Sequence, residues 1–153
     1  MLNGFRFAVA PTASSTLDAR LARWAALHAV LLLAGTAGAL VGGVLWPVIA
    51  AGAASFAGFA AVFHRHWTPG GAFGLANTLT ALRLVGFIAL AVLPLAPPWI
   101  AGAAAVLLLL DGADGWLARR FEQASDFGAF FDKEVDAFAL LVLCLLAVHH
   151  QGM

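Results

Sequence analysis

Charged residues are scarce in this chain of 153 residues. Asp, Glu, Lys and Arg together make up 10% of it, whereas 63% of the residues are hydrophobic. A soluble domain carries about a quarter charged residues, so this chain has too little polar surface to cover a water-soluble globule. The formal net charge is zero, which gives no case for binding nucleic acid. Composition therefore places the chain among membrane proteins.

Cysteine is rare in this chain, and a secretory signal pattern is missing from its N-terminus. The single cysteine, Cys144, lies in an apolar run and cannot form an internal disulfide. The N-terminus lacks the pattern of a secretory signal, because the run Phe7–Ala13 is too short for an apolar region with a cleavage site. The segment Ser15–Trp24 interleaves charged and apolar residues, and it predicts an amphipathic helix on the membrane surface. A disordered tail leading into the first span is the alternative.

Long apolar segments fill the rest of the chain. A membrane-spanning helix takes about 20 mostly apolar residues, and we expect spans at Ala25–Leu45, Pro47–Phe63, Leu79–Leu95, Pro98–Leu117 and Phe127–Val148. The predicted fold is all-α: a polytopic membrane helix bundle of about five transmembrane helices with an N-terminal surface helix. We divide the chain into a cytoplasmic N-terminal segment (1–24), two additional membrane helices (25–68) and a core (69–153).

The basic residues predict the orientation. If the N-terminus is inside, all eight Lys and Arg fall in inward segments, and so do all eight Asp and Glu. The outward turns, at Trp46-Pro47 and Pro94–Pro98, contain no charged residue. Positively charged loops stay in the cytoplasm. The sequence therefore predicts an integral, multi-pass membrane protein with its charged end facing the cytoplasm.

Four carboxylates stand at the charged ends of two predicted spans. Asp111 and Asp114 are three residues apart, and Asp132 and Asp136 are four apart, so each pair shares one face of a helix. Ionisable residues at such depth are costly and are functional candidates by default. Four neighbouring carboxylates repel one another unless a cation binds. Oxygen-only ligands suit Mg²⁺ or Mn²⁺, often together with a substrate phosphate.

The residues between the carboxylates suit phosphate binding. Gly115 lets a ligand approach the backbone, Arg119 offers a guanidinium for bidentate contact with a phosphate, and Gly128 allows close packing of the next helix. Any one of the carboxylates alone would be a solvated loop residue. The whole pattern is D-x2-D-G-x2-A-R-x8-G-x3-D-x3-D, running from Asp111 to Asp136 through Ala118. Eight specified residues at fixed spacing rarely arise by chance.

This pattern resembles the CDP-alcohol phosphotransferase family, also called CDP-alcohol phosphatidyltransferases. The family also tends to carry an N-x2-T-x2-R run, supplied here by Asn77, Thr80 and Arg83. The resemblance implies two bound ions, Mg²⁺ or Mn²⁺. By resemblance the metal ligands are Asp111, Asp114, Asp132 and Asp136, with Asp136 also the catalytic base. The substrate-binding residues by resemblance are Asn77, Thr80, Gly115, Arg119 and Ser125.

The implied function is transfer of a phosphatidyl or other substituted phosphate group from a CDP-linked donor to an alcohol acceptor, with release of CMP, in phospholipid biosynthesis. The implied partners are that donor and acceptor, membrane lipids and a second copy in a homodimer. The implied location is a membrane of the bacterial inner-membrane type. Family members usually have six core helices, but only three predicted spans begin after Asn77. We therefore expect either a C-terminally truncated piece, with a partial core in 69–153, or a natural short form.

Three other interpretations remain open. The first is an inactive fragment or a non-catalytic membrane protein that keeps the CDP-lipid and metal-binding motif. The second is a prenyltransferase, which binds a diphosphate through metal-held aspartates. Prenyltransferases space their aspartates differently and lack the fixed Gly and Ala-Arg between them. An ion or proton pathway is the third. It fits poorly, because the acids gather at one membrane face rather than forming a row across it.

Overall fold

The structure is a computed structural model that describes residues 13–150. These residues form α-helices and short connections, with no β-strand in that range. The helices are α1 (Ala13–Gly42), α2 (Trp46–Val62), a 3₁₀ turn η1 (His64–His66), α3 (Leu75–Val92), α4 (Pro97–Leu109), α5 (Asp111–Arg120) and α6 (Asp126–His150). The predicted all-α bundle is confirmed.

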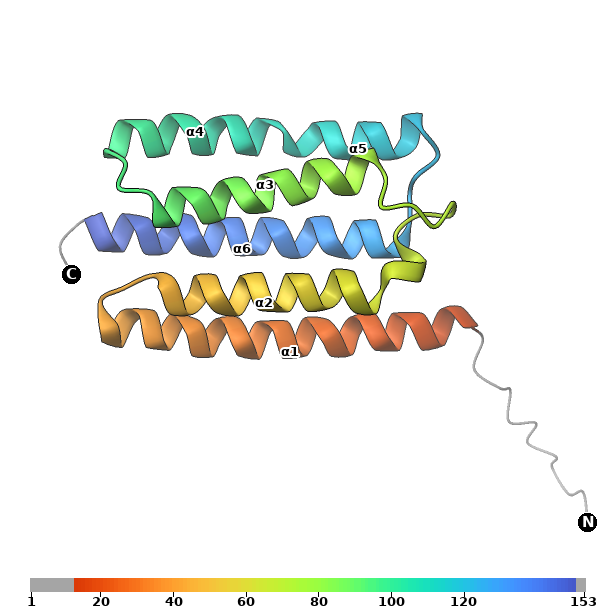
Figure 1. Cartoon of the computed structure of the whole chain (residues 1–153), viewed down its shortest axis with the longest axis horizontal. Coiled ribbons are helices and arrows are strands. Elements are labelled where there is room, and N and C mark those ends of the chain that lie inside the picture. The colour runs from red at the N-terminus through yellow and green to blue at the C-terminus, as the bar shows by residue number, and fades with distance from the viewer. Residues whose placement is uncertain (1–12, 151–153) are drawn as a thin grey trace, which may run out of the picture.

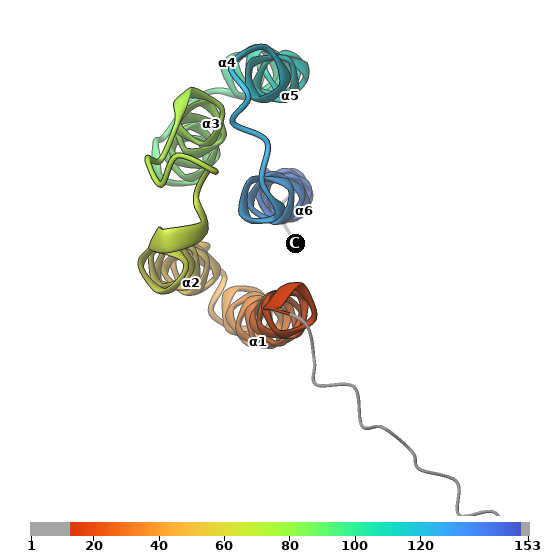
Figure 2. The ribbon, with the colours of Figure 1, turned by 90° about the vertical axis from the view of Figure 1, so that its right-hand side faces the viewer.

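The helices run side by side along one common direction (Figure 1). Seen end-on, α1, α2, α3 and the α4–α5 pair form a curved row, and α6 lies on its inner side (Figure 2). The start of α1, the α2–α3 loop and the α5–α6 loop lie at one end of the bundle. The α1–α2 and α3–α4 turns lie at the other end. This up-and-down order brings the predicted inward segments to one end.

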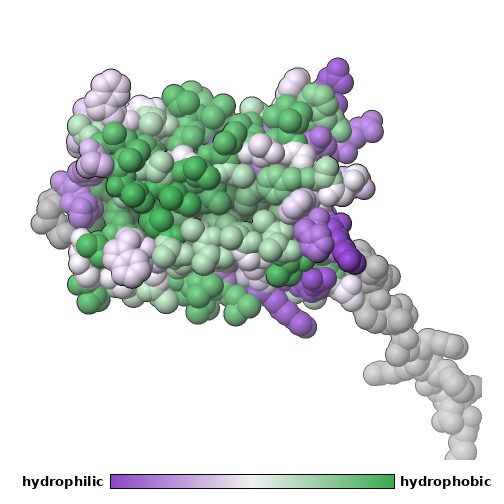
Figure 3. All heavy atoms as spheres, viewed as in Figure 1, coloured by the Kyte–Doolittle hydropathy of each residue, from purple (hydrophilic) through white to green (hydrophobic). Residues whose placement is uncertain are grey.

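Three helical stretches are long and apolar enough to cross a membrane: Thr16–Gly42, Leu75–Val92 and Pro97–Arg120. Helix α2 is apolar but has only 17 residues, and α6 carries acidic residues in its first turns. That α2 and α6 also span the membrane, which would bring the number of spans to five, therefore stays a prediction. Figure 3 shows hydrophobic residues over the middle of one face and hydrophilic ones gathered toward the ends, as expected of an integral membrane protein.

Helix α1 corrects the prediction of a separate surface helix. Residues 15–24 are helical, but α1 continues unbroken from Ala13 to Gly42. Within it, Leu21 is fully buried, and the Trp24 ring stacks on Phe59 of α2 at 3.9 Å between centroids. The segment has apolar partners inside the bundle, and the sequence offers no helix breaker after Trp24. It therefore extends the first span instead of lying apart on the membrane.

The predicted span Pro98–Leu117 is divided into α4 and α5 at Leu110. There the amide of Ala113 bonds to the carbonyl of Leu110 (3.0 Å), a contact three residues back that tightens the turn. Helix α5 follows α4 in nearly the same line (Figure 1). The division places Asp111 at the first residue of α5, beside α3.

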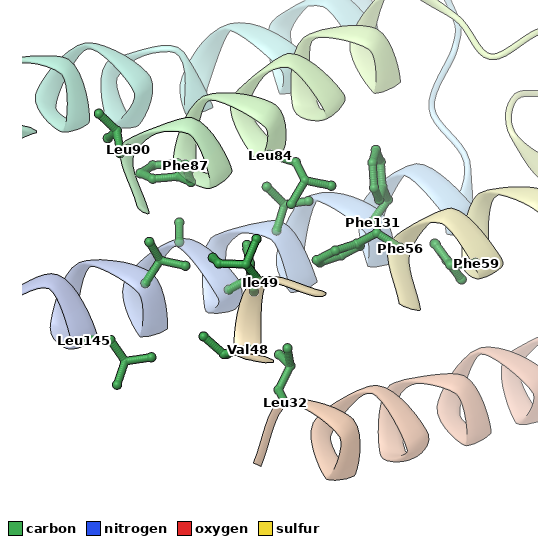
Figure 4. Packing of buried hydrophobic residues seen from close by; sticks show 14 of the residues in the cluster. Leu32, Val48, Ile49, Phe56, Phe59, Leu84, Phe87, Leu90, Phe131 and Leu145 are labelled. Carbon is green, nitrogen blue, oxygen red and sulfur yellow. The ribbon is translucent and has the colours of Figure 1, made fainter. Parts of the chain in front are cut away.

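Aromatic side chains join α2 to α6. Phe56 and Phe59 of α2 pack against the buried face of α6 (Figure 4), and the Phe59 and Phe127 rings stack at 4.7 Å. Gly52 makes the closest approach, because a methyl group in place of its hydrogen would lie 2.5 Å from the Phe138 ring. This packing adds to the contacts of α6 with α3 and helps to position the helix that carries two of the four motif carboxylates.

Candidate active site

Arg83 of α3 lies at the centre of the carboxylate cluster. Its side chain is fully buried, and its terminal nitrogens lie 2.5–2.9 Å from oxygens of all four motif carboxylates: Asp111, Asp114, Asp132 and Asp136. Helix α3 packs against both α5 and α6. One guanidinium therefore joins residues that are 25 positions apart in the sequence.

The guanidinium sorts the carboxylates into cross-helix pairs. Its Nη1 donates to Asp114 and Asp132, both at 2.9 Å. Its Nη2 contacts Asp111 at 2.7 Å and donates to Asp136 at 2.5 Å. Each pair combines one carboxylate of α5 with one of α6. The Asp111–Asp136 pair lies one helical turn further from the α5–α6 loop than the Asp114–Asp132 pair.

Asp114 is the most firmly held of the four. Its side chain is 4% exposed, whereas those of the other three are 37–44% exposed. The Thr80 hydroxyl donates to its Oδ2 (3.0 Å), and the Gly115 amide donates to its Oδ1 (2.7 Å). Both oxygens are therefore fixed in direction before any ligand binds.

The residues fit a divalent cation. Asp111, Asp114 and Asp132 each offer one oxygen, and these atoms lie within 4.8 Å of one another. Oδ1 of Asp111 is buried and accepts no hydrogen bond within the described residues, since its contact with Arg83 has ion-pair distance without hydrogen-bond geometry. An all-oxygen set with one free acceptor suits Mg²⁺ or Mn²⁺. Asp136 lies outside this group, so its assignment as a ligand stays a prediction.

A cavity of about 250 Å³ opens beside Asp114 and Asp132. All five residues expected to bind substrate line it: Asn77, Thr80, Gly115, Arg119 and Ser125. Arg119 is exposed and makes no ion pair within residues 13–150, so its charge is available to a ligand. A larger cavity of about 820 Å³ lies at the other end of the bundle, and no described Asp or Glu lines it.

Asn77 and Ser125 also hold the surrounding backbone. The Asn77 amide donates to the carbonyls of Trp67 (3.0 Å) and Phe73 (2.7 Å). The Ser125 hydroxyl donates to Trp67 (2.7 Å) and accepts from the Gly128 amide (3.0 Å), which makes it the N-cap of α6. Part of their hydrogen-bonding capacity is thus used to fix the walls of the cavity.

The sequence interpretation missed the position of Arg83. It treated Arg83 as part of a motif and as evidence for orientation, without a partner. The available signal was one cation in the otherwise apolar helix Leu75–Val92, because a buried charge needs an opposite charge. Gln123 was also missed. Its Oε1 accepts the Leu75 amide (2.8 Å), linking the α5–α6 loop to the start of α3.

Comparison with protein families decides the relationship. Residues 73–153 match the model of the CDP-alcohol phosphatidyltransferase family. The chain belongs to this family. The matched region of the CDP-alcohol phosphatidyltransferase model contains α3, α4, α5 and α6, and thus Arg83, the four carboxylates and the cavity beside them. The resemblance inferred from the motif is therefore confirmed.

A curated relative is the CDP-diacylglycerol–glycerol-3-phosphate 3-phosphatidyltransferase of Pseudomonas fluorescens. It is 37% identical over 81 residues, which cover 50% of this chain and 42% of the relative. The chain thus spans less than half the length of the curated relative it matches. No solved structure matches the chain.

Proposed function

We propose that this protein transfers a phosphatidyl group from a CDP-linked lipid to an alcohol, with release of CMP. The observation that carries the proposal is the cavity of about 250 Å³, which joins two carboxylates of the cluster to an unpaired cation, Arg119. Family membership supports the same reaction class. From the name of the relative, we propose CDP-diacylglycerol as the donor and glycerol 3-phosphate as the acceptor.

Asp111, Asp114 and Asp132 would hold one Mg²⁺ or Mn²⁺. Asp136, which lies outside that group, would contribute to a second ion. When bound, such ions neutralise phosphate oxygens and stabilise the departing phosphate. The Arg83 contacts already bring these carboxylates together across two helices. The protein's own contribution is thus to hold the carboxylates in a fixed arrangement before the substrate enters.

The donor pyrophosphate would lie in the cavity beside Arg119 and the backbone of Gly115. A methyl group at Gly115 would lie in contact with the Arg119 guanidinium, at 3.5 Å. The absence of a side chain therefore leaves the Gly115 backbone and Arg119 open to the same ligand. The acceptor hydroxyl oxygen attacks the phosphorus on the lipid side, and a new P–O bond forms. The P–O bond to CMP breaks, and CMP leaves with that electron pair. Asp136 takes the hydroxyl proton.

The reaction would take place at the cytoplasmic face of a bacterial-type inner membrane. This proposal is supported by the gathering of Arg65, Arg119, Arg120 and Lys133 at one end of the bundle. CDP-linked substrates and glycerol 3-phosphate are then supplied from the same side. We propose that the protein works as a homodimer within the surrounding membrane lipids.

The test measures CMP release and lipid product together. Membranes containing the full chain are supplied with CDP-diacylglycerol and Mg²⁺, with glycerol 3-phosphate or another alcohol from a panel. The expected result is CMP release in equal amounts with a phosphatidyl-alcohol product, and no release when the metal or the acceptor is omitted. Metal-dependent binding of CDP-diacylglycerol without CMP release from any alcohol would overturn the proposal and favour a non-catalytic lipid-binding protein.

A further inference from the structure

We propose that Arg83 is the built-in counter-cation of the carboxylate cluster, and that a divalent cation displaces its guanidinium from Asp114 and Asp132. The inference rests on the proposed function, because it concerns the metal site assigned there. It adds a role for Arg83: this side chain neutralises the cluster when the metal is absent and competes with the metal for the same oxygens.

The Arg83 guanidinium and the proposed metal ion would use carboxylate groups of the same residues. Arg83 Nη1 lies 2.9 Å from one oxygen each of Asp114 and Asp132. These two residues are also two of the three whose oxygens lie close enough to share a metal ion. An oxygen engaged by a charged N–H donor is a poorer metal ligand, and two cations between the same carboxylates repel each other.

The charges explain why a resident cation is needed. Four carboxylates and one guanidinium leave a formal charge of −4 + 1 = −3. Without Arg83 the cluster would hold four uncompensated negative charges, one of them on the buried side chain of Asp114 and three on partly exposed side chains. Removing one partner from a buried ion pair is strongly destabilising, because the other charge is left unpaired. Arg83 therefore allows the bundle to form before metal is bound.

The arrangement allows partial release of the guanidinium. Nη2 keeps its contacts with Asp111 and Asp136 one helical turn away, and Nε donates to the Leu107 carbonyl at 3.3 Å. The guanidinium is a rigid plane, so Nη1 leaves its two oxygens only when the whole group tilts about its Nη2 contacts. The bond from Nε to Leu107, at 3.3 Å the longest of its hydrogen bonds, is lost in that tilt. The side that it vacates adjoins the cavity, which Asp114 and Asp132 line. A metal entering from the cavity thus meets the Nη1 pair first.

The test measures Mn²⁺ binding by the purified full chain in lipid nanodiscs, with free Mn²⁺ followed by electron paramagnetic resonance and no substrate present. Wild type is compared with Arg83→Gln and with the control Arg120→Gln, since Arg120 is exposed and makes no ion pair among the described residues. Because one positive charge leaves the site, Arg83→Gln is expected to bind Mn²⁺ at least about tenfold more tightly. Arg120→Gln should stay within about twofold of wild type, because exposed charges are screened.

Equal or weaker Mn²⁺ binding by folded Arg83→Gln would overturn the inference, since Arg83 would then act only as a scaffold for the carboxylates. That result leaves the proposed function standing. If neither wild type nor Arg83→Gln binds Mn²⁺, both proposals fall. The assay of CMP release is a separate measurement, so the two failures are distinguishable.

A thermal unfolding measurement covers the case in which Arg83→Gln fails to fold. If Arg83→Gln unfolds without metal, Mn²⁺ is expected to restore its thermal unfolding transition, because the metal replaces the missing charge. If Mn²⁺ does not restore that transition, Mn²⁺ binding by a second variant, Arg83→Lys, tests the inference instead. Its compact ammonium cannot bridge both carboxylate pairs as a planar guanidinium does, so it should bind Mn²⁺ more tightly than wild type. Binding no tighter than wild type would overturn the inference.

Discussion

Thr80 shows how one uncharged side chain prepares the site. Its buried hydroxyl lies 3.0 Å from Asp114 Oδ2 and 3.2 Å from the Ala76 carbonyl. A hydroxyl carries one proton, so it can donate to only one of these at a time. The contact with Asp114 is the charge-assisted one and is the stronger. Thr80 thus directs an oxygen that Arg83 also holds.

Thr80→Val tests this orientation. Valine keeps the shape but removes the donor, and a hydrogen bond to a charged group contributes about 1.5–3 kcal/mol. We expect CMP release to fall by roughly ten- to a hundredfold, and the unfolding temperature to fall as well, because the same buried hydrogen bond stabilises the folded bundle. Thr78→Val is the matched control, because exposed Thr78 bonds only the Gly74 carbonyl one turn back. Equal losses in both variants would show that Thr80 has no particular role.

At this scale the sequence predicted many of the residues that the fold brings together, and their roles stay predictions. The spacing from Asp111 to Asp136 predicted all four carboxylates, and all five expected substrate residues line one cavity. The pairing of each carboxylate with one on the other helix was not predictable. Spacing pairs Asp111 with Asp114, whereas the fold pairs Asp111 with Asp136 through Arg83. Helical periodicity describes one helix at a time, and the register between helices depends on packing.

At the scale of the elements, the Phe138 ring of α6 packs directly on Gly52 of α2. Gly52 faces the Phe138 ring with no room for a methyl group. Small residues allow such approach between membrane helices. The abundance of glycine indicated packing positions without showing which helices meet at them. The sequence likewise could not predict where α1 continues or where α4 ends, because the packing of Trp24 on α2 decides the first and a tightened turn at Leu110 decides the second.

Gly52→Ala tests the role of this contact. The added methyl group would lie 2.5 Å from Phe138 Cε2, and overpacking of this kind costs about 1–3 kcal/mol. We expect a lower unfolding temperature in detergent. Gly58→Ala, on the same helix with nothing within 4 Å of the added group, is the control and should be neutral or slightly stabilising. An unchanged Gly52→Ala protein would mean that α2 and α6 pack less closely than described.

For the whole molecule, the account predicts which end faces the cytoplasm. The α2–α3 loop and the α5–α6 loop lie at the same end as the carboxylate cluster, and the α1–α2 turn lies at the opposite end. Basic residues gather at the cluster end, and no Lys or Arg occurs in the 43–45 or 93–96 turns. These asymmetries favour a cytoplasmic site.

Cysteine labelling tests this orientation. In a Cys144→Ala background, Gly70→Cys places a thiol in the exposed α2–α3 loop and Trp46→Cys places one at the opposite end. A membrane-impermeant maleimide should label Trp46→Cys in intact cells and Gly70→Cys only in inverted vesicles. The reverse pattern would place the cluster on the outer face and contradict the proposed access of cytoplasmic substrates.

The most direct test of the central claim compares Asp132→Asn with Glu134→Gln in the CMP-release assay across a range of Mg²⁺ concentrations. Asp132 belongs to the three-carboxylate group proposed to hold the metal and lines the cavity, whereas Glu134 lies two residues away and makes no ion pair in the described chain. Loss of even an indirect partner of a metal ligand costs roughly 10–100-fold, so the account predicts a loss of at least about 100-fold in Asp132→Asn. Glu134→Gln should keep near-wild-type turnover. Wild-type turnover in Asp132→Asn would contradict the claim that this cluster is the active site.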